Sequence, residues 1–313
     1  MTPSAADVAR TEPLAAFLER TRARVDEALE RYLPRPPACP PLMSEAMRYS
    51  VFAGGKRFRP ILTLAAADAV ARGADAAALP AACAIELIHT YSLIHDDLPA
   101  MDNDTLRRGR PTLHVVYGDG IAILAGDGLQ AEAFALLARE PADAALAARR
   151  LRVLQVVAEA AGSIGMVGGQ AIDLQAAGQA PGPRVDLDAD GLRGMHARKT
   201  GALIRASAVS GAVMAGAGED AVRAADRYAA DLGLAFQIVD DILDVEGEAG
   251  QLGKTAGKDA AAAKPTYPAL FGLDRSRTLA AECIARAHAA LEEARLADGW
   301  LGAIADWILH RKS

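Results

Sequence analysis

The chain has 313 residues, of which 51% are hydrophobic and only 4% aromatic, and alanine is abundant throughout. This composition favours many close-packed helices over strands, because alanine is the strongest helix former. The formal net charge of −6 excludes a general nucleic-acid binder, so any basic surface must be local.

Three further features indicate a cytoplasmic protein. No run of about eighteen uncharged apolar residues occurs, so we expect no membrane span. The N-terminus lacks the apolar segment of a secretory signal. The cysteines have neither disulfide pairing nor zinc-type spacing, so we expect buried thiols in a reducing compartment. These cysteines are Cys39, Cys83 and Cys283.

Apolar residues at helical spacing run through most of the chain. The first predicted helix, residues 14–33, ends at the proline-rich connection 34–41. A second begins at Leu42 and runs into the GGKRFRP segment, and a clear loop covers 178–190. The later helices are expected at 61–71, 79–95, 121–139, 142–161, 162–175, 192–214, 220–244, 278–296 and 301–310. No strand alternation, repeat or linker divides the chain, so we predict one all-α domain with residues 1–41 as its N-terminal part and 42–313 as its main body.

An acidic and then basic cluster follows the apolar helix predicted at 79–95. Its residues are Asp96, Asp97, Asp102, Asp104, Arg107, Arg108 and Arg110. Carboxylates this close repel one another unless a cation neutralises them, and a hard divalent cation with oxygen ligands is the usual solution. The arginines suit a bound phosphate, because guanidinium groups match phosphate oxygens. A solvated acidic and basic turn is the alternative.

The spacing of the first cluster requires a turn. Asp96 and Asp102 are six residues apart, so on one continuous helix their side chains would diverge. Pro99 disfavours helical geometry at Leu98 and removes a backbone donor, so the helix should end there. We therefore expect the chain to turn after Leu98 and bring Asp102 back beside Asp96.

A second acidic cluster lies in FQIVDDILDVEGE. Asp240 and Asp244 are four residues apart and share one helix face. The apolar flanks indicate a buried helix, where unpaired aspartates such as Asp240 and Asp241 would be costly. Metal ligation is therefore favoured over a solvated surface helix.

Basic residues accompany both acidic clusters. GGKRFRP is weak evidence alone, although its glycines let the backbone approach a ligand closely. The basic residues that could form a positive rim are Lys56, Arg57, Arg59, Arg107, Arg108, Lys199, Lys254 and Lys258. A nucleotide site is disfavoured, because neither a P-loop pattern nor a strand before G-x-G-x-x-G occurs.

Six segments, in order and spacing, resemble the trans-polyprenyl diphosphate synthases, most of all their bacterial farnesyl diphosphate synthase branch. These segments are GGKRFRP, ELIHTYSLIHDDLPAMDNDTLRRGRPT, GGQAID, KTGAL, FQIVDDILD and LGKTAGKD. The resemblance covers Leu42 to the C-terminus and makes 42–313 the catalytic domain. It implies an all-α bundle around a deep cavity, usually a homodimer. Such an enzyme joins isopentenyl diphosphate head-to-tail to an allylic diphosphate with Mg²⁺.

The resemblance also implies roles for individual residues. Three Mg²⁺ ions would be held by Asp96, Asp102 and Asp240. Isopentenyl diphosphate would be bound by Lys56, Arg59, His89 and Arg108. The allylic diphosphate and its cation would be bound by Arg107, Lys199, Thr200, Gln237 and Lys254. Supporting positions would be Asp97, Asp241, Asp244 and Lys258. The departing pyrophosphate would accept the proton, and His95 and His114 are expected to be structural.

Product length depends on Tyr91, which lies five residues before Asp96 and about 7.5 Å below it along a helix. In the family that this sequence resembles, a bulky aromatic residue at the position of Tyr91 accompanies a fifteen-carbon product. Farnesyl diphosphate is therefore predicted, with geranylgeranyl diphosphate as the alternative. Tyr91 could instead pack sideways into the core. A terpene cyclase would change the second acidic cluster and a non-catalytic subunit would lose one cluster, so both are disfavoured.

Overall fold

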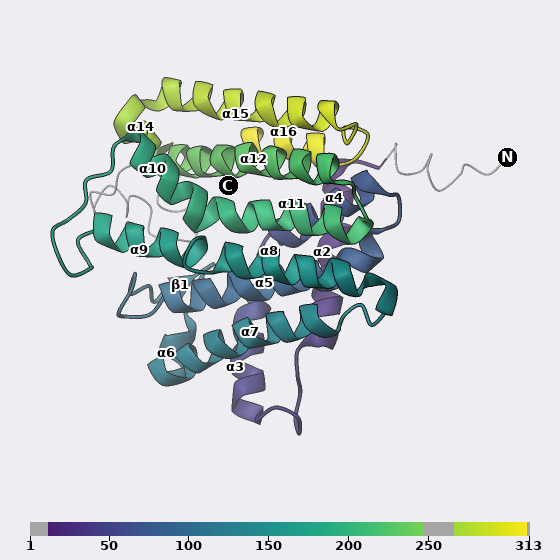
Figure 1. Ribbon diagram of the computed structural model, residues 1–313. Helices are drawn as coiled ribbons and strands as arrows, with labels where there is room; N and C mark the ends of the chain where they lie inside the picture. Colours follow the sequence, from purple (N-terminus) through teal and green to yellow (C-terminus); the bar gives the residue numbers. More distant parts are fainter. Residues whose placement is uncertain (1–11, 247–265, 312–313) are drawn as a thin grey trace.

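The computed structural model describes residues 12–246 and 266–311, and these form an all-α bundle (Figure 1). Within the described ranges the one sheet is an antiparallel hairpin of two-residue strands, β1 (Leu106–Arg107) and β2 (Arg110–Pro111). The helices are α2 (Leu14–Tyr32), α3 (Pro41–Val51), α4 (Phe58–Val70), α5 (Asp75–Asp96), α6 (Leu113–Tyr117), α7 (Asp119–Arg139), η1 (Ala144–Leu146), α8 (Ala147–Ala161), α9 (Met166–Ala176), α10 (Ala189–His196), η2 (Ala197–Gly201), α11 (Ala202–Ala215), α12 (Glu219–Glu246), α14 (Tyr267–Phe271), α15 (Leu273–Glu293) and α16 (Leu301–His310).

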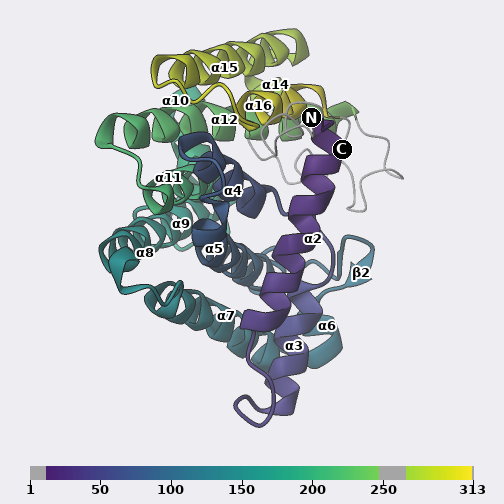
Figure 2. The same ribbon diagram turned by 90° about the vertical axis from the view of Figure 1, so that its right-hand side faces the viewer.

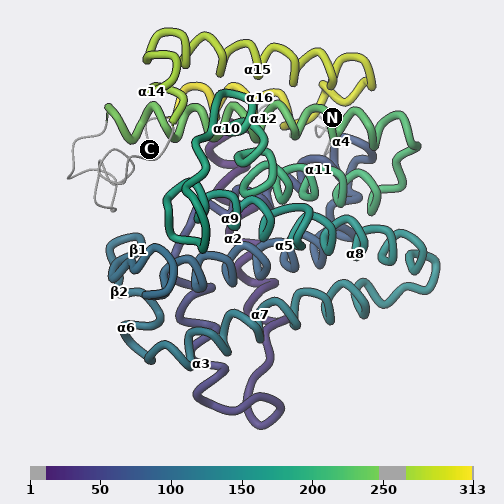
Figure 3. Tube along the Cα trace, turned by 60° about the vertical axis from the view of Figure 1, so that its left-hand side comes forward, coloured from purple at the N-terminus to yellow at the C-terminus, as the bar shows by residue number. Residues whose placement is uncertain are grey.

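Helix α5, which contains the apolar helix predicted at 79–95, is the centre of the bundle. It runs between α7 on one side and α11 on the other, and α4 packs along it as well (Figures 2 and 3). Its side chains are buried around most of the helix, because few of them are charged. Helix α12 packs mainly on α15 and α11, on the opposite side of the bundle from α7 (Figure 1). The two acidic clusters therefore lie at the ends of two separate helices, α5 and α12.

Glycines account for the largest departure from the predicted helices. The segment 162–165 forms a turn, and α9 begins only at Met166. A Cβ atom on Gly165 would lie 2.2 Å from the carbonyl oxygen of Ala160, so a side chain does not fit in this turn. The helix predicted at 192–214 is also divided, by the π-helical turn η2. The hairpin and the short helices α6 and α14 were not predicted, because each is too short to show a periodicity.

Helix α7 and the run Ala144–Ala176, which contains η1, α8 and α9, leave much of their apolar surface outside the core. By length and hydropathy, α5, α7 and the run Ala144–Ala176 could each cross a membrane, with 78%, 39% and 33% of the apolar window buried. Burial inside the bundle explains the apolar character of α5. The expectation of no membrane span stays a prediction. All three cysteines are free and buried, as predicted.

Candidate active site

The first acidic cluster turns back on itself as predicted. After α5 ends, the backbone N–H of Asp102 donates to the carbonyl of Asp96 over 2.9 Å, and that of Asn103 donates to Leu98 over 3.1 Å. Asn103 has a positive φ of 51°, a conformation that asparagine tolerates better than most residues. The turn after Leu98 therefore brings the two aspartates together, although their role as metal ligands stays a prediction.

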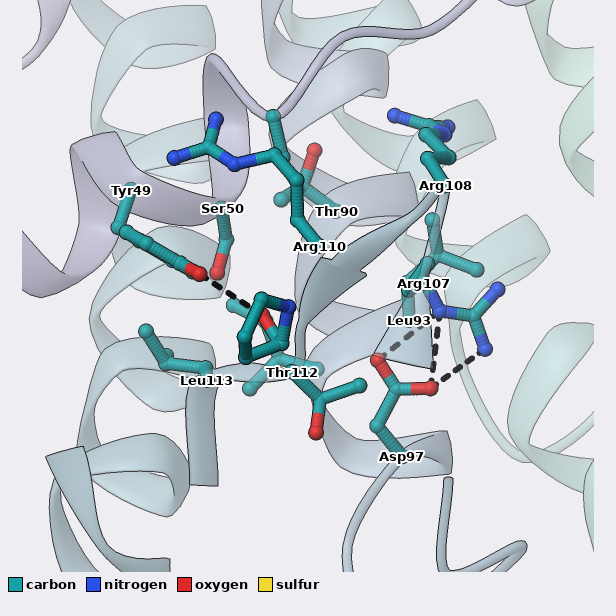
Figure 4. Close-up of a pocket in the computed structure, with 13 residues that line it drawn as sticks. Tyr49, Ser50, Thr90, Leu93, Asp97, Arg107, Arg108, Arg110, Thr112 and Leu113 are labelled. Carbon is teal, nitrogen blue, oxygen red and sulfur yellow. Dashed lines mark hydrogen bonds and ion pairs between the residues drawn. The ribbon is translucent and has the colours of Figure 1, made fainter. Parts of the chain in front are cut away.

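Asp97 fixes the arginine hairpin to α5. Its carboxylate is 5% exposed and accepts three bonds from Arg107, two from Nε at 2.8 and 2.9 Å and one from Nη2 at 2.6 Å (Figure 4). Arg108, the next residue, points away from this pair. Two adjacent arginines are thereby directed to different places, and the separate roles predicted for them stay predictions.

Asp96 is a partly buried carboxylate with a perturbed pKa. Burial raises its pKa to about 6, and the nearby Asp102 adds to the shift, while Lys199 and Arg107 oppose it. Carboxylates crowded in this way are the oxygen ligands that a hard divalent cation prefers. Asp96 and Asp102 therefore fit Mg²⁺, although no group of three metal-ligating side chains is assembled within residues 12–246 and 266–311.

Lys199 reaches Asp96 from the facing helices. Its ammonium binds the carboxylate of Asp173 over 2.5 Å. Burial acts to lower the pKa of Lys199, but Asp173, Asp96 and Asp102 outweigh burial and raise it. Asp173 was not singled out from the sequence, although GGQAID contains it. The spacing along the chain could not indicate a partner 26 residues away.

A glycine allows this contact between α9 and η2. A Cβ atom on Gly169 would lie 2.2 Å from the backbone nitrogen of Lys199, so only glycine lets the two backbones meet. Thr200 lies in the same π-helical turn as Lys199. The neighbouring Gln170 has both side-chain polar atoms buried without a partner among the described residues. GGQAID and KTGAL, separate in sequence, thus form one wall.

The second acidic cluster lies at the C-terminal end of α12, where Gln237 precedes it by one turn. Asp240 accepts a 2.5 Å bond from Arg311, and the Arg311 guanidinium also lies 4.0 Å from the centre of the Phe236 ring. Asp241 is buried and accepts a 2.9 Å bond from the backbone N–H of Tyr267. Arg311 was not predicted as a site residue, and the only indication in the sequence was the basic character of the C-terminal residues. Asp244 is partly exposed on the same helix.

Three basic side chains lie close together between α4, α5 and the hairpin, namely Arg59, His89 and Arg108. With Lys56, whose ammonium lies 5.9 Å from the centre of the Trp307 ring, they are called here the cationic cluster. Burial lowers the pKa of His89 well below its usual value, and Arg59 and Arg108 add to the shift. Burial likewise lowers the pKa of Arg59, whose Nε has no hydrogen-bond partner in the described ranges. A bound anion would stabilise such a site.

The backbone of GGKRFRP is shaped around this cluster. Arg108 donates to the carbonyl of Gly54, and a Cβ atom on Gly55 would lie 2.6 Å from its Nη1. Gly55 has a φ of +133°, which side chains rarely adopt. Burial, and then Arg311, lowers the pKa of Lys56, while Asp240 opposes the shift. Because Asp240 also acts on Arg59, the cationic cluster lies close to the second acidic cluster.

Some of the remaining predicted residues lie in the described part of the chain, and two lie outside it. Tyr91 is buried near Asp96, its ring meets the His95 ring edge-on at 5.6 Å, and its hydroxyl has no partner in the described part of the chain. His95 itself lies 3.1 Å from the carbonyl of Ile123, consistent with a structural role. Lys254 and Lys258 lie outside the described residues.

Comparisons with known proteins show the family of this chain. The polyprenyl synthetase family profile matches residues 40–297. A geranylgeranyl diphosphate synthase from Cyanophora paradoxa is 43% identical over 96% of this chain and 97% of its own length. A farnesyl diphosphate synthase from Geobacillus stearothermophilus is 48% identical over 82% of this chain and 84% of its own. The crystal structure of an FPP/GFPP synthase from Zymomonas mobilis matches with a TM-score of 0.80 and 39% identity, covering 95% of this chain and 98% of that one.

Proposed function

The chain belongs to the polyprenyl synthetase family and is a prenyltransferase, and we propose that it makes farnesyl diphosphate. It would join isopentenyl diphosphate head-to-tail to dimethylallyl and then geranyl diphosphate. The observation that carries this proposal is the pairing of the cationic cluster, which contains the partly buried Arg59 and His89, with two acidic clusters on α5 and α12. One ligand chemistry needs concentrated positive charge and the other needs carboxylates, as two different diphosphates would.

The allylic diphosphate would lie between the two acidic clusters. Asp96, Asp102 and Asp240 would hold Mg²⁺, which neutralises the negative charge that develops on the departing pyrophosphate. Lys199 lies close to Asp96 and would grip the same diphosphate, with its amine held in place by Asp173. Positive charge fixed in advance at a departing anion is often the largest catalytic contribution.

Isopentenyl diphosphate would occupy the cationic cluster. Burial and the neighbouring arginines lower the pKa of His89, which favours its neutral form, so it would hydrogen-bond without adding charge. Arg59 and Arg108 would supply guanidinium forks for the phosphate oxygens. Thr200, Gln237 and the Lys199 carbonyl would direct their dipoles at the allylic cation. The pyrophosphate would then accept the proton that the coupled product loses.

Product length is the finer part of the proposal. Tyr91 is buried below Asp96, in the direction in which a growing hydrocarbon tail would extend. The Tyr91 ring favours a fifteen-carbon product, because it would block further elongation of the hydrocarbon tail. Relatives of similar identity carry both farnesyl and geranylgeranyl names, so geranylgeranyl diphosphate is the second candidate.

We also propose that two copies pair through α7 and the α8–α9 region. Exposed apolar side chains gather on these helices, where a monomer would leave them in water. They include Ile123, Leu124, Leu151, Ile164 and Val167, with exposures between 44% and 70%. A second copy would bury this surface and account for the apolar faces of α7 and α8.

Light scattering at matched concentrations would test the pairing. Ile123→Glu and Ile164→Glu should each shift the protein from dimer to monomer. Leu270→Glu, on the distant helix α14, should not, although Leu270 is comparably exposed at 43%. A wild-type protein that runs as a monomer would contradict the proposal.

One assay tests the proposed activity. Radiolabelled isopentenyl diphosphate would be incubated with dimethylallyl or geranyl diphosphate, with and without Mg²⁺, and the product chain length measured. We expect Mg²⁺-dependent farnesyl diphosphate from both primers. A twenty-carbon product would favour the second candidate. A cyclised hydrocarbon, or no incorporation of label, would contradict the proposed reaction.

A further inference from the structure

Arg57 lies between two members of the cationic cluster in sequence but binds elsewhere. Its side chain is only 3% exposed. Nε donates to Asp26 over 2.8 Å, Nη1 donates to Glu86 over 2.8 Å, and Nη2 donates to the carbonyl of Val51 over 2.6 Å. These partners come from α2, α5 and α3, so one guanidinium joins three helices. A lysine could not make the same set of bonds, because it lacks the planar fork.

The backbone at Arg57 needs such an anchor. Its φ is +50°, a left-handed conformation that is unfavourable for residues other than glycine. Gly54 and Gly55 before it also have positive φ values. A segment in which three of four consecutive residues have a positive φ holds its path only when surrounding contacts fix it. The buried guanidinium supplies those contacts, and the same path sets the positions of Lys56 and Arg59.

Glu86 links this anchor to the helix that carries His89. It lies one turn before His89 on α5, and its carboxylate is 4% exposed. The Arg57–Glu86 pair therefore ties the GGKRFRP segment to α5, so that both sides of the cationic cluster are held by one contact. Glu86 also acts on the pKa of Arg59, which burial lowers and Glu86 opposes. Since Glu86 bonds to Arg57, Arg59 keeps a buried Nε without a partner among the described residues.

We propose that Arg57 and Glu86 are positioning residues for the isopentenyl diphosphate site. They fix the positions of Lys56, Arg59 and His89 relative to one another. Their ion pair also engages the buried Glu86 carboxylate, which would otherwise neutralise the positive charge of the site. This inference rests on the proposed function, because it assumes that the cationic cluster binds isopentenyl diphosphate.

The decisive variant removes both charges at once. Arg57→Met alone leaves a buried carboxylate unpaired and should lower the melting temperature strongly. Arg57→Met/Glu86→Met replaces the ion pair by apolar side chains of similar size and should regain most of that stability. The apparent KM for isopentenyl diphosphate should nevertheless stay raised by about ten-fold or more in the double variant. The KM for the allylic substrate should stay within about two-fold of wild type.

Calorimetric binding of isopentenyl diphosphate without an allylic substrate gives a readout independent of turnover. The double variant should bind it about ten-fold more weakly at near-normal melting temperature. If affinity returns together with stability, the pair is merely structural and the inference is wrong. Equal changes for both substrates would also contradict it.

A control variant and two variants of the cationic cluster itself distinguish failure of the positioning role from failure of the proposed isopentenyl diphosphate pocket. Arg205→Met removes a two-bond arginine–aspartate pair between α11 and α12, with Asp226 accepting at 2.7 and 2.8 Å, but on the surface. It should leave both KM values unchanged. If Lys56→Ala and Arg59→Ala fail to weaken isopentenyl diphosphate binding, the proposed pocket itself is wrong. If they weaken it and the double variant does not, only the positioning role fails.

Discussion

The two halves of the candidate active site treat buried charge in opposite ways. In the cationic cluster, His89 and Arg59 are partly buried beside other arginines, and the pKa of each is lowered. In the acidic half, cations already accompany the carboxylates: Lys199 binds Asp173, and Arg311 binds Asp240. Under the proposed function the first half would receive an anion, whereas in the second half metal and substrate would bind where cations are already present. The first half would gain a counter-charge on binding, and Asp240 in the second would exchange one for another.

The largest expected effect comes from removing a carboxylate of the acidic half. Asp96→Ala and Asp240→Ala should each lower turnover by about 10²–10³-fold, because each removes a proposed ligand of the cation that stabilises the leaving pyrophosphate. Initial rates at saturating Mg²⁺ would measure this, with circular dichroism to confirm folding.

Asp220→Ala is the control for that pair. Asp220 lies on the same helix as Asp240, but its side chain is 96% exposed. Its loss should leave turnover unchanged. Near-normal activity of Asp96→Ala or Asp240→Ala would remove the basis for the proposed metal site.

Kinetics should separate the two halves by substrate. Lys56→Ala or Arg59→Ala should raise the KM for isopentenyl diphosphate about ten- to hundred-fold, since charged hydrogen bonds contribute about 1.5–3 kcal/mol. Lys199→Ala should instead raise the KM for the allylic substrate, and so should Lys254→Ala, which lies outside the described residues. Steady-state kinetics with each substrate varied would show the split. If both sets of variants affect the same substrate, the division of the site is wrong.

A smaller effect is expected from removing Arg311, which forms an ion pair with Asp240. An incoming cation must displace this arginine, which is 4% exposed and bound over 2.5 Å. Arg311→Met should therefore lower the Mg²⁺ concentration for half-maximal rate by about two- to five-fold, the equivalent of one modest ion pair. Arg277→Met is the control, because it removes a surface ion pair with Glu246, which lies at the end of α12, the helix that carries Asp240. An unchanged or higher Mg²⁺ requirement would show that Arg311 does not compete with the metal.

The sequence predicted local geometry well and tertiary partners poorly. Pro99 was enough to predict the turn that returns Asp102 to Asp96, because proline restricts the backbone on both sides. The bonds of Lys199 to Asp173 and of Arg311 to Asp240 depend instead on how distant helices pack. No spacing along the chain encodes such contacts. Arg57 shows the same limit, since its motif indicated a ligand contact and its side chain binds other helices.

The smallest expected change in rate, with a change in product, comes from Tyr91. Tyr91 is 5% exposed, its ring contacts the His95 ring, and its hydroxyl has no partner in the described ranges. Under the proposed function this ring would close the far end of the space for the hydrocarbon tail. Tyr91→Ala should open this space and lengthen the product by at least one five-carbon unit. Total incorporation of isopentenyl units should change by no more than about two-fold, because the residue lies about 7.5 Å from the aspartate end of the site. Tyr91→Phe keeps the ring and should keep the fifteen-carbon product. If Tyr91→Ala also makes only fifteen carbons, the ring packs sideways and another residue sets the depth.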